Sequence, residues 1–167
     1  MNGDRISAVG ALPGQGALVL VADGYPDAQW EYGVRLRRAG FRVAFASSGE
    51  EALAQARLLR PDAVIIDLAL RGTDGWTAIR DIRSDIRLDD VRILALSERA
   101  EPRHERFAYE CGCDLFVTKT CPVETLLSVL HGLLAKPEGV FASGARMRTA
   151  DVHPHLEPPE VPARSTG

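Results

Sequence analysis

This sequence of 167 residues has no long hydrophobic run, and that absence narrows the classes of protein it can encode. The apolar stretch within residues 1–20 is interrupted by Asp4, by Pro13 and by a Gly-Gln-Gly run, and it lacks a basic leader. Such a stretch is too short to span a bilayer and does not fit an export signal. We therefore expect a cytoplasmic protein with no membrane partner.

Cysteine is scarce, and basic charge is not in excess. Three cysteines, an odd number, favour free thiols in a reducing compartment over a disulfide framework. Cys111, Cys113 and Cys121 lack a zinc spacing, and neither His104 nor His131 completes one. A net charge of −3 gives no electrostatic basis for binding nucleic acid. We expect no nucleic-acid partner and no zinc site.

The composition that remains is that of a globular domain, with 46% hydrophobic and 26% charged residues. We expect a flexible leader over residues 1–16, one folded domain over 17–136 and a disordered tail over 137–167. The tail is punctuated by prolines and has few large apolar residues, so little burial is available to offset its chain entropy. His153 and His155 fall in this tail and are given no role.

Five short apolar runs alternate with five segments of helical character between residues 17 and 135. The runs lie near 17–22, 41–46, 63–67, 91–97 and 114–118. Alternation of strands and helices predicts an α/β fold with a doubly wound parallel sheet that is covered by helices on both faces.

Each helical segment is predicted to bury one stripe of side chains. In the last segment the stripe contains Val123, Leu126, Leu127, Leu130, Leu133 and Leu134. In the third it contains Trp76, Ile79, Ile82 and Ile86, and in the second, which Ser47 or Ser48 can cap, it contains Ala52, Ala56 and Leu59. Trp30 is also predicted to be a packing residue. The segment near 101–111 is short and polar, so we expect it to be the least firmly packed.

Four of the apolar runs end in a polar side chain: Asp23, Asp67, Ser97 and Lys119. The carboxyl ends of parallel strands meet at one edge of the sheet, where open α/β folds place their chemistry. Each residue alone also has a plainer explanation, such as a solvated acid, a surface lysine or a hydroxyl that satisfies the backbone. Together they predict a site with two carboxylates, a hydroxyl and an ammonium group.

Six sequence motifs resemble response regulator receiver domains, the aspartate-phosphorylated half of two-component signalling. The motifs occur in the family's order and spacing. The six motifs are Val21–Asp27, Ser48–Leu53, Arg60–Asp67, Gly72–Gly75, Ala95–Ser97 and Gly112–Lys119. The resemblance covers residues 17–135. It implies a flavodoxin-like fold with five parallel strands in the order 2-1-3-4-5 and five helices.

The resemblance also implies roles for the residues at the strand ends. Asp67 would accept a phosphoryl group from a histidine kinase or a histidine phosphotransferase, because a carboxylate is a competent covalent nucleophile. Mg²⁺ would be held by Asp23, by Asp67 and by the backbone carbonyl of Ala69. Lys119 would pair with a phosphoryl oxygen as a point charge.

The response to phosphorylation is implied in the same way. The hydroxyl of Ser97 would donate to the phosphoryl group and move inward, and Phe116, at the family's aromatic switch position, would turn inward with it. Phe116 could equally be an ordinary core residue. The output would be contact with a downstream protein through the fourth helix, fifth strand and fifth helix.

Four positions depart from the family's pattern. Gly24 stands where the family has a second acid that contacts the metal directly, so we expect weaker Mg²⁺ binding. Thr120 replaces a proline that follows a cis peptide in the family, and since a cis bond before threonine costs about 3–4 kcal/mol, we expect a trans bond and a shifted Lys119 loop. Glu98 replaces a small residue and would narrow the pocket, and Arg71 replaces a proline and would make its loop more mobile.

These departures leave two main functions open. The leading one is a single-domain response regulator that is not an enzyme, beyond its own phosphorylation and dephosphorylation. The alternative is a degenerate receiver that binds partners without being phosphorylated. A hydrolase with Ser97 as nucleophile is disfavoured, because no G-x-S-x-G motif surrounds this residue. The cognate kinase and the oligomeric state, including a homodimer, stay open.

Overall fold

The computed structural model describes residues 16–70, 72 and 74–135. Over these residues strands and helices alternate: β1 (Leu18–Ala22), α1 (Pro26–Arg38), β2 (Arg42–Ala46), α2 (Gly49–Leu59), β3 (Ala63–Asp67), α3 (Gly75–Ser84), a 3₁₀ turn (Ile86–Leu88), β4 (Arg92–Ser97), α4 (Pro102–Cys111), β5 (Leu115–Thr118) and α5 (Val123–Leu134). The predicted leader, apart from Gly16, and the predicted tail with its two histidines lie outside the described residues, as does Arg71.

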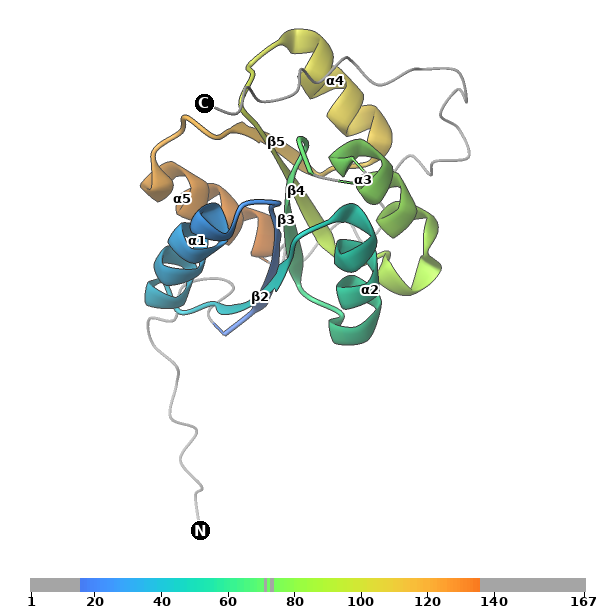
Figure 1. Ribbon diagram of the computed structural model, residues 1–167. Helices are drawn as coiled ribbons and strands as arrows, with labels where there is room; N and C mark the ends of the chain where they lie inside the picture. Colours follow the sequence, from blue (N-terminus) through green and yellow to red (C-terminus); the bar gives the residue numbers. More distant parts are fainter. Residues whose placement is uncertain (1–15, 71, 73, 136–167) are drawn as a thin grey trace.

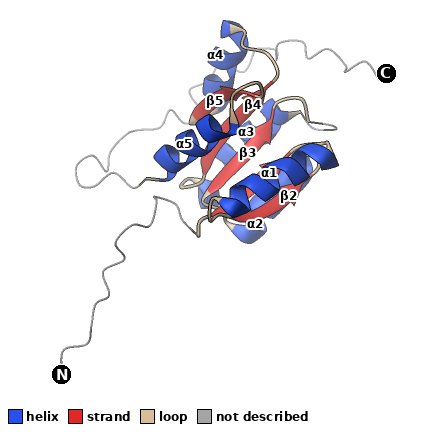
Figure 2. Cartoon of the chain, turned by 90° about the vertical axis from the view of Figure 1, so that its left-hand side faces the viewer, coloured by secondary structure: helices blue, strands red, loops and turns tan. Residues whose placement is uncertain are grey.

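The five strands form one parallel sheet in the order β2-β1-β3-β4-β5. This confirms the flavodoxin-like topology predicted from the sequence. Helices α1 and α5 cover one face of the sheet, and α2, α3 and α4 cover the other (Figures 1 and 2). All the carboxyl ends of the strands therefore point to the same edge, as the predicted site requires.

The sheet separates two hydrophobic clusters. Val64 and Ile66 of β3 contribute to the cluster under α2, α3 and α4, while Ala63 and Ile65 contribute to the cluster under α1 and α5. All five residues of β3 are buried because the strand lies in the middle of the sheet with helices on both sides. Burial on both faces explains why the sequence of β3 is a continuous apolar run and not an alternating one.

The helix predictions are confirmed where a cap or a clear period supports them. Ser48 caps α2, since its hydroxyl accepts a hydrogen bond from the backbone N–H of Glu51. In α5 the predicted stripe faces the sheet, with Leu126 and Leu130 buried and Leu127 packed against them. A period of three and four thus identified the buried face of this helix.

Three predicted packing residues are exposed. Leu59 is 38% exposed because α2 ends at this residue and the following Arg60 adopts a left-handed conformation. Ile86 is 74% exposed because α3 ends at Ser84, so the helical period does not continue to residue 86. Trp30 is 72% exposed because α1 turns its buried residues, including Leu36, toward the sheet and leaves the indole outside.

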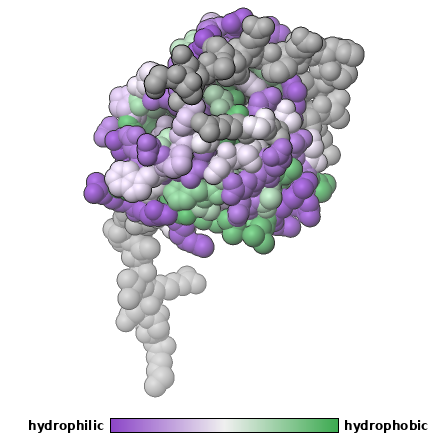
Figure 3. Space-filling model, in the orientation of Figure 1, coloured by the Kyte–Doolittle hydropathy of each residue, from purple (hydrophilic) through white to green (hydrophobic). Residues whose placement is uncertain are grey.

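Exposed apolar side chains gather near the C-terminal end of α2. Leu58 and Leu59 lie on this helix, and hydrophobic colour covers the same part of the surface in the space-filling view (Figure 3). Single exposed leucines are common on soluble domains, so this area carries no functional argument. None of the helices in the described ranges is long and apolar enough to cross a membrane.

Arg83, near the end of α3, ties this helix to the amino ends of β4 and β5. Its guanidinium donates to the carbonyl oxygens of Gly112 and Val91, both at 2.6 Å, and to the carboxylate of Asp114. Only 9% of the Arg83 side chain is exposed. Gly112 has a φ of 105°, and a Cβ at this position would lie 2.7 Å from Cγ of Arg83. The glycine is therefore required both by its backbone conformation and by the arginine beside it.

Helix α4 is better packed than its polar sequence suggested. His104 is 3% exposed, and it lies on the same face as the buried residues Phe107, Ala108 and Cys111. The imidazole stacks on Trp76 of α3, with 6.0 Å between the ring centroids. Within the described part of the chain, Nδ1 of His104 and Nε1 of Trp76 have no hydrogen-bond partner.

The buried imidazole predicts a pH dependence of stability. Burial lowers the pKa of His104 below its ordinary value, although Glu101 opposes the shift, and Arg103 and Arg99 add to it. The unfolded chain therefore binds the proton more tightly, and stability is present above the ordinary histidine pKa and lost as the pH falls below it. Between about pH 7.5 and about pH 5.5, the urea midpoint should fall more in the wild type than in His104→Phe. Equal losses in both proteins would contradict this prediction.

Candidate functional site

Three of the predicted site residues meet at the carboxyl edge of the sheet. The ammonium nitrogen of Lys119 donates to Oδ2 of Asp23 at 2.8 Å and to Oδ2 of Asp67 at 2.7 Å. Both aspartates are 1% exposed, whereas the Lys119 side chain is 15% exposed. The two carboxylates are therefore held against one shared cation, although they lie 44 residues apart in the sequence.

Asp67 is fixed by the end of β3 and by a tight turn after it. Its Oδ1 accepts a hydrogen bond from the backbone N–H of Ala69 at 3.0 Å. Gly75 passes directly beneath this turn, and a Cβ there would lie 2.4 Å from the carbonyl oxygen of Asp67 and 2.6 Å from Cα of Leu68. Because these contacts are with backbone atoms, which cannot rotate away, only glycine fits at position 75.

Asp23 is held by its backbone as well as by Lys119. Its N–H donates to the carbonyl of Ala46 at 3.1 Å, and its Oδ1 accepts from the N–H of Tyr25 at 2.9 Å. Its carbonyl accepts a hydrogen bond of 2.7 Å from the side-chain amide of Gln29. Sequence reasoning gave Gln29 no role, and a glutamine on a half-exposed helix face carries no pattern that would have identified it.

Lys119 and Ser97 are neighbours across β4 and β5. The backbone N–H of Lys119 donates to the carbonyl of Ser97 at 2.7 Å, and Ser97 is 8% exposed. The Ser97 hydroxyl accepts a hydrogen bond of 3.1 Å from the N–H of Arg99, which is the backbone role weighed for it from the sequence. The peptide bond before Thr120 is trans, as predicted, and Lys119 nevertheless reaches both carboxylates.

Burial and the shared ammonium group act against each other in the ionisation of the site. Burial raises the pKa of Asp67 above its ordinary value, and hydrogen bonds from Lys119 and from the Ala69 amide limit the rise. Burial alone would lower the pKa of Lys119, but its hydrogen bonds to Asp23 and Asp67 outweigh burial and raise it. The lysine therefore stays protonated and supplies the cation that permits two buried carboxylates.

The remaining predicted residues surround this centre. Ala69 lies in the turn after Asp67, and Phe116 of β5 is half-buried and packs against the cluster under α2, α3 and α4. Glu98 is exposed at the end of β4. The switch role of Phe116 and the effect of Glu98 on access stay predictions.

The donor set fits a hard divalent cation only in part. Asp23 and Asp67 supply carboxylate oxygens that already converge on one cation, and oxygen ligands are those that Mg²⁺ prefers. Across the chain segments described here, however, no three His, Cys, Asp or Glu side chains form a metal-binding group. Two carboxylates are therefore in place, the Ala69 carbonyl stays a predicted ligand, and water would have to complete an octahedral shell.

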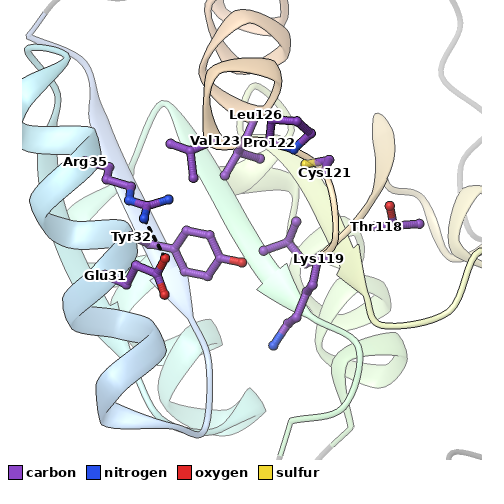
Figure 4. Close-up of a pocket in the computed structure, with 10 residues that line it drawn as sticks. Glu31, Tyr32, Arg35, Thr118, Lys119, Cys121, Pro122, Val123 and Leu126 are labelled. Carbon is purple, nitrogen blue, oxygen red and sulfur yellow. Dashed lines mark ion pairs between the residues drawn. The ribbon is translucent and has the colours of Figure 1, made fainter.

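A pocket of about 220 Å³ lies beside the centre, between α1 and the start of α5 (Figure 4). Its lining includes Tyr32 and the ion pair of Glu31 and Arg35 on α1, and Cys121 after β5. Lys119 contributes to its wall, and the Tyr32 side chain points into the same space. Burial raises the pKa of Tyr32, and Lys119 opposes this. The pocket thus adjoins the lysine without containing the carboxylates.

This topology, with an aspartate at the centre of its carboxyl edge and a lysine bound to it, defines an α/β signalling domain of the receiver type. The comparison of sequences agrees: the chain belongs to the response regulator receiver domain family, which it matches over residues 19–131. Domains of this family act in two-component signalling, where they interact with histidine kinases and downstream targets.

Individual relatives differ in how much of their length is matched. The chain is 25% identical to PilH of Pseudomonas aeruginosa over 119 residues, which are 71% of this chain and 98% of PilH. It is 29% identical to the DNA-binding regulator RpaA of Synechocystis over 122 residues (73% of this chain, 51% of RpaA). It is 31% identical to the DNA-binding response regulator MtrA of Mycolicibacterium smegmatis over 120 residues (72% and 51%). The chain therefore spans about half the length of these two regulators.

Solved structures show the same fold. The chemotaxis protein CheY4 of Vibrio cholerae superimposes with a TM-score of 0.68 at 28% identity, covering 71% of this chain and 99% of CheY4. The receiver domain of the sensor kinase PA1611 of Pseudomonas aeruginosa, which has a magnesium ion coordinated in its active-site cleft, gives a TM-score of 0.67 at 27% identity, covering 71% and 98%.

Proposed function

We propose that this chain is a phosphoacceptor receiver domain that takes a phosphoryl group onto Asp67 and signals through protein–protein contacts. The observation that supports the proposal best is the pairing of Lys119 with both Asp23 and Asp67, at 2.8 and 2.7 Å. Three side chains from three strand ends are held in a geometry that an isolated surface acid or lysine would not need. The donor would be a histidine kinase or a histidine phosphotransferase in the cytoplasm.

The transfer exchanges one bond to phosphorus for another. A carboxylate oxygen of Asp67 forms the new P–O bond as the P–N bond to the donor histidine breaks, and the imidazole takes the bonding electron pair. Asp67 loses its own negative charge, and the phosphoryl group brings new anionic oxygens to the same place. Lys119, 2.7 Å from Asp67, is positioned to pair with one of these oxygens.

Asp23, Asp67 and the Ala69 carbonyl would hold Mg²⁺, which neutralises phosphoryl charge when it is bound. Gly24 supplies no carboxylate, so we propose that the metal binds more weakly than in receivers that have an acid at this position. The chain itself would catalyse at most its own phosphorylation and dephosphorylation.

The response would begin at Ser97, which lies one residue beyond the β4 position that pairs with Asp67. Its hydroxyl would leave the N–H of Arg99 and donate to a phosphoryl oxygen. Since Ser97 and Lys119 are joined through their backbones, this movement would affect the end of β5, on which half-buried Phe116 lies. Phe116 would then turn inward and change the surface formed by α4, β5 and α5.

Incubation with Mg²⁺ and a small phosphodonor such as acetyl phosphate tests the proposal. Intact-protein mass spectrometry should show one added phosphoryl group on the wild type and none on Asp67→Asn, which keeps the size of the side chain but removes the nucleophile. Glu50→Gln, at an exposed position on α2, serves as the control and should be phosphorylated normally. A wild type that gains no phosphoryl group would refute the proposal.

A wild type that gains no phosphoryl group would instead favour the second function, a degenerate receiver that binds partners without being phosphorylated. The observation behind this second function is that Lys119 already satisfies both carboxylates, while Gly24 removes a metal ligand. A partner that binds wild type and Asp67→Asn with equal affinity, whether or not a phosphodonor is added, would identify an interaction module that works without phosphorylation.

A further inference from the structure

Gln29 joins the ends of two strands beside the site. Its side-chain nitrogen donates to the carbonyl oxygen of Asp23 at 2.7 Å, to the carbonyl oxygen of Ala46 at 3.1 Å and to the hydroxyl of Ser47 at 3.3 Å. The residue lies near the start of α1, where its own N–H donates to the carbonyl of Tyr25 and closes the first turn of the helix. One amide group therefore connects α1, the end of β1 and the end of β2.

These contacts lie at and just beyond the last paired residues of the two strands. The β1–β2 register ends with Ala22 opposite Ala46, and one further backbone bond runs from the N–H of Asp23 to Ala46. Without Gln29, the Asp23 carbonyl would lose this partner at the point where the chain leaves the sheet. The Gln29 amide thus links β1 to β2 where their backbone hydrogen bonds end, and it holds the backbone of Asp23 in place.

This restraint matters more here because of the residue that follows Asp23. Gly24 has no side chain, so it adds no carboxylate and places few limits on its own backbone. Asp23 is therefore the sole carboxylate that the β1–α1 connection offers at positions 23 and 24. The position of that single carboxylate depends on the backbone that Gln29 holds.

We infer that Gln29 is a positioning residue for divalent-cation binding: it fixes the Asp23 backbone so that the carboxylates of Asp23 and Asp67 can share one cation. The inference rests on the proposed function for the identity of the site, but it concerns a residue that does not touch the cation. Residues that orient metal ligands typically change metal affinity by ten- to a hundred-fold when they are replaced. Because the two carboxylates are also held by Lys119, we expect a change of about ten-fold.

The test measures Mn²⁺ binding, with Mn²⁺ as a paramagnetic divalent cation that also takes oxygen ligands. Gln29→Met keeps the length and helix propensity of the side chain but removes the donors, and Gln29→Asn keeps an amide that is one methylene shorter. Gln55→Met is the matched control, since Gln55 is another half-buried glutamine, on α2. Dissociation constants are measured by electron paramagnetic resonance on the full chain, and thermal unfolding of each variant is recorded separately.

The expected result is about ten-fold weaker Mn²⁺ binding in Gln29→Met, a smaller loss in Gln29→Asn and no change in Gln55→Met. A purely structural role would lower the melting temperature and leave the dissociation constant of the folded protein unchanged, and that outcome would overturn the inference. If Gln29→Met does not fold, unchanged affinity in Gln29→Asn overturns it equally. A wild type without Mn²⁺ binding overturns it as well.

The phosphorylation assay on the wild type keeps this inference separate from the proposed function. A wild type that binds Mn²⁺ through Gln29-dependent geometry but accepts no phosphoryl group would support the positioning role and refute the phosphoacceptor. A wild type that is phosphorylated, together with a Gln29→Met variant that binds Mn²⁺ normally, would support the phosphoacceptor and refute the positioning role.

Discussion

Replacing Lys119 with methionine should destabilise the fold by about 3 kcal/mol at neutral pH, because it leaves two buried carboxylates without their shared cation. Methionine keeps most of the length of the side chain, so the effect would come from the charge and not from a cavity. Burial already raises the pKa of Asp67 in the presence of the lysine. Without the lysine, protonation of a carboxylate would relieve the repulsion between Asp23 and Asp67. The loss of stability should therefore become smaller as the pH falls from about 8 to about 5. Urea unfolding at both pH values measures the effect.

Two further measurements separate charge from packing in this variant. Adding Asp67→Asn to Lys119→Met removes one of the unpaired charges and should recover part of the lost stability. Mg²⁺ should also stabilise Lys119→Met more than the wild type, since the competing ammonium group is gone and ligand binding adds to folding stability. A Lys119→Met protein as stable as the wild type would show that the carboxylates do not depend on the lysine.

Arg83→Met should destabilise the fold about as much as Lys119→Met, by about 3 kcal/mol, although Arg83 lies at the opposite edge of the sheet. The substitution removes donors from the carbonyl oxygens of Gly112 and Val91 and from the carboxylate of Asp114. Asp114 keeps the N–H of Ile93, at 2.7 Å, which prevents a still larger loss. Denaturant unfolding followed by circular dichroism checks this expectation.

Arg87→Met is the matched control. Arg87 also pairs with an aspartate, Asp85, but its side chain is 56% exposed. Solvent screens the charge of Arg87, and Asp85, although only 7% exposed, keeps a second cation because Arg57 donates to it at 2.8 Å. The unfolding midpoint should therefore move much less than in Arg83→Met. If the two arginine variants lose similar stability, the buried contacts of Arg83 are not the cause.

Sequence periodicity predicted the sheet well because each strand of this fold has a simple local signature. The run from Ala63 to Ile66 is apolar throughout, which is typical of a strand covered on both faces, and the structure buries all of it together with the Asp67 that ends it. The polar residues that end the strands follow from the same argument, since parallel strands share one carboxyl edge. Asp23, Asp67 and Lys119 were therefore predicted to meet, and they do.

The errors occur where a residue's environment depends on how an element ends. Leu59 and Ile86 fit a helical period, but their helices stop at or before them, and the period says nothing of where the next segment goes. Trp30 was assigned to packing from its residue type alone, and α1 places it in solvent. Leu59 and Ile86 needed the geometry of helix termini, and Trp30 needed the orientation of α1 on the sheet.

Gln29 and His104 were missed for different reasons. Gln29 bonds to backbone carbonyls of β1 and β2, and such acceptors exist at every residue of a sequence. His104 was detectable in principle, because it shares a period of three and four with Phe107, Ala108 and Cys111. Its polar neighbours concealed this stripe.

The different surroundings of the two tryptophans give the domain a natural optical reporter. Trp76 packs against both His104 and Phe107, with its ring centroid 6.0 and 5.1 Å from theirs, whereas Trp30 is 72% exposed. Once Trp30 is replaced by phenylalanine, all remaining indole emission comes from Trp76, at the interface between α3 and α4. A fluorometer can then follow displacement of α4 in real time, without any attached dye.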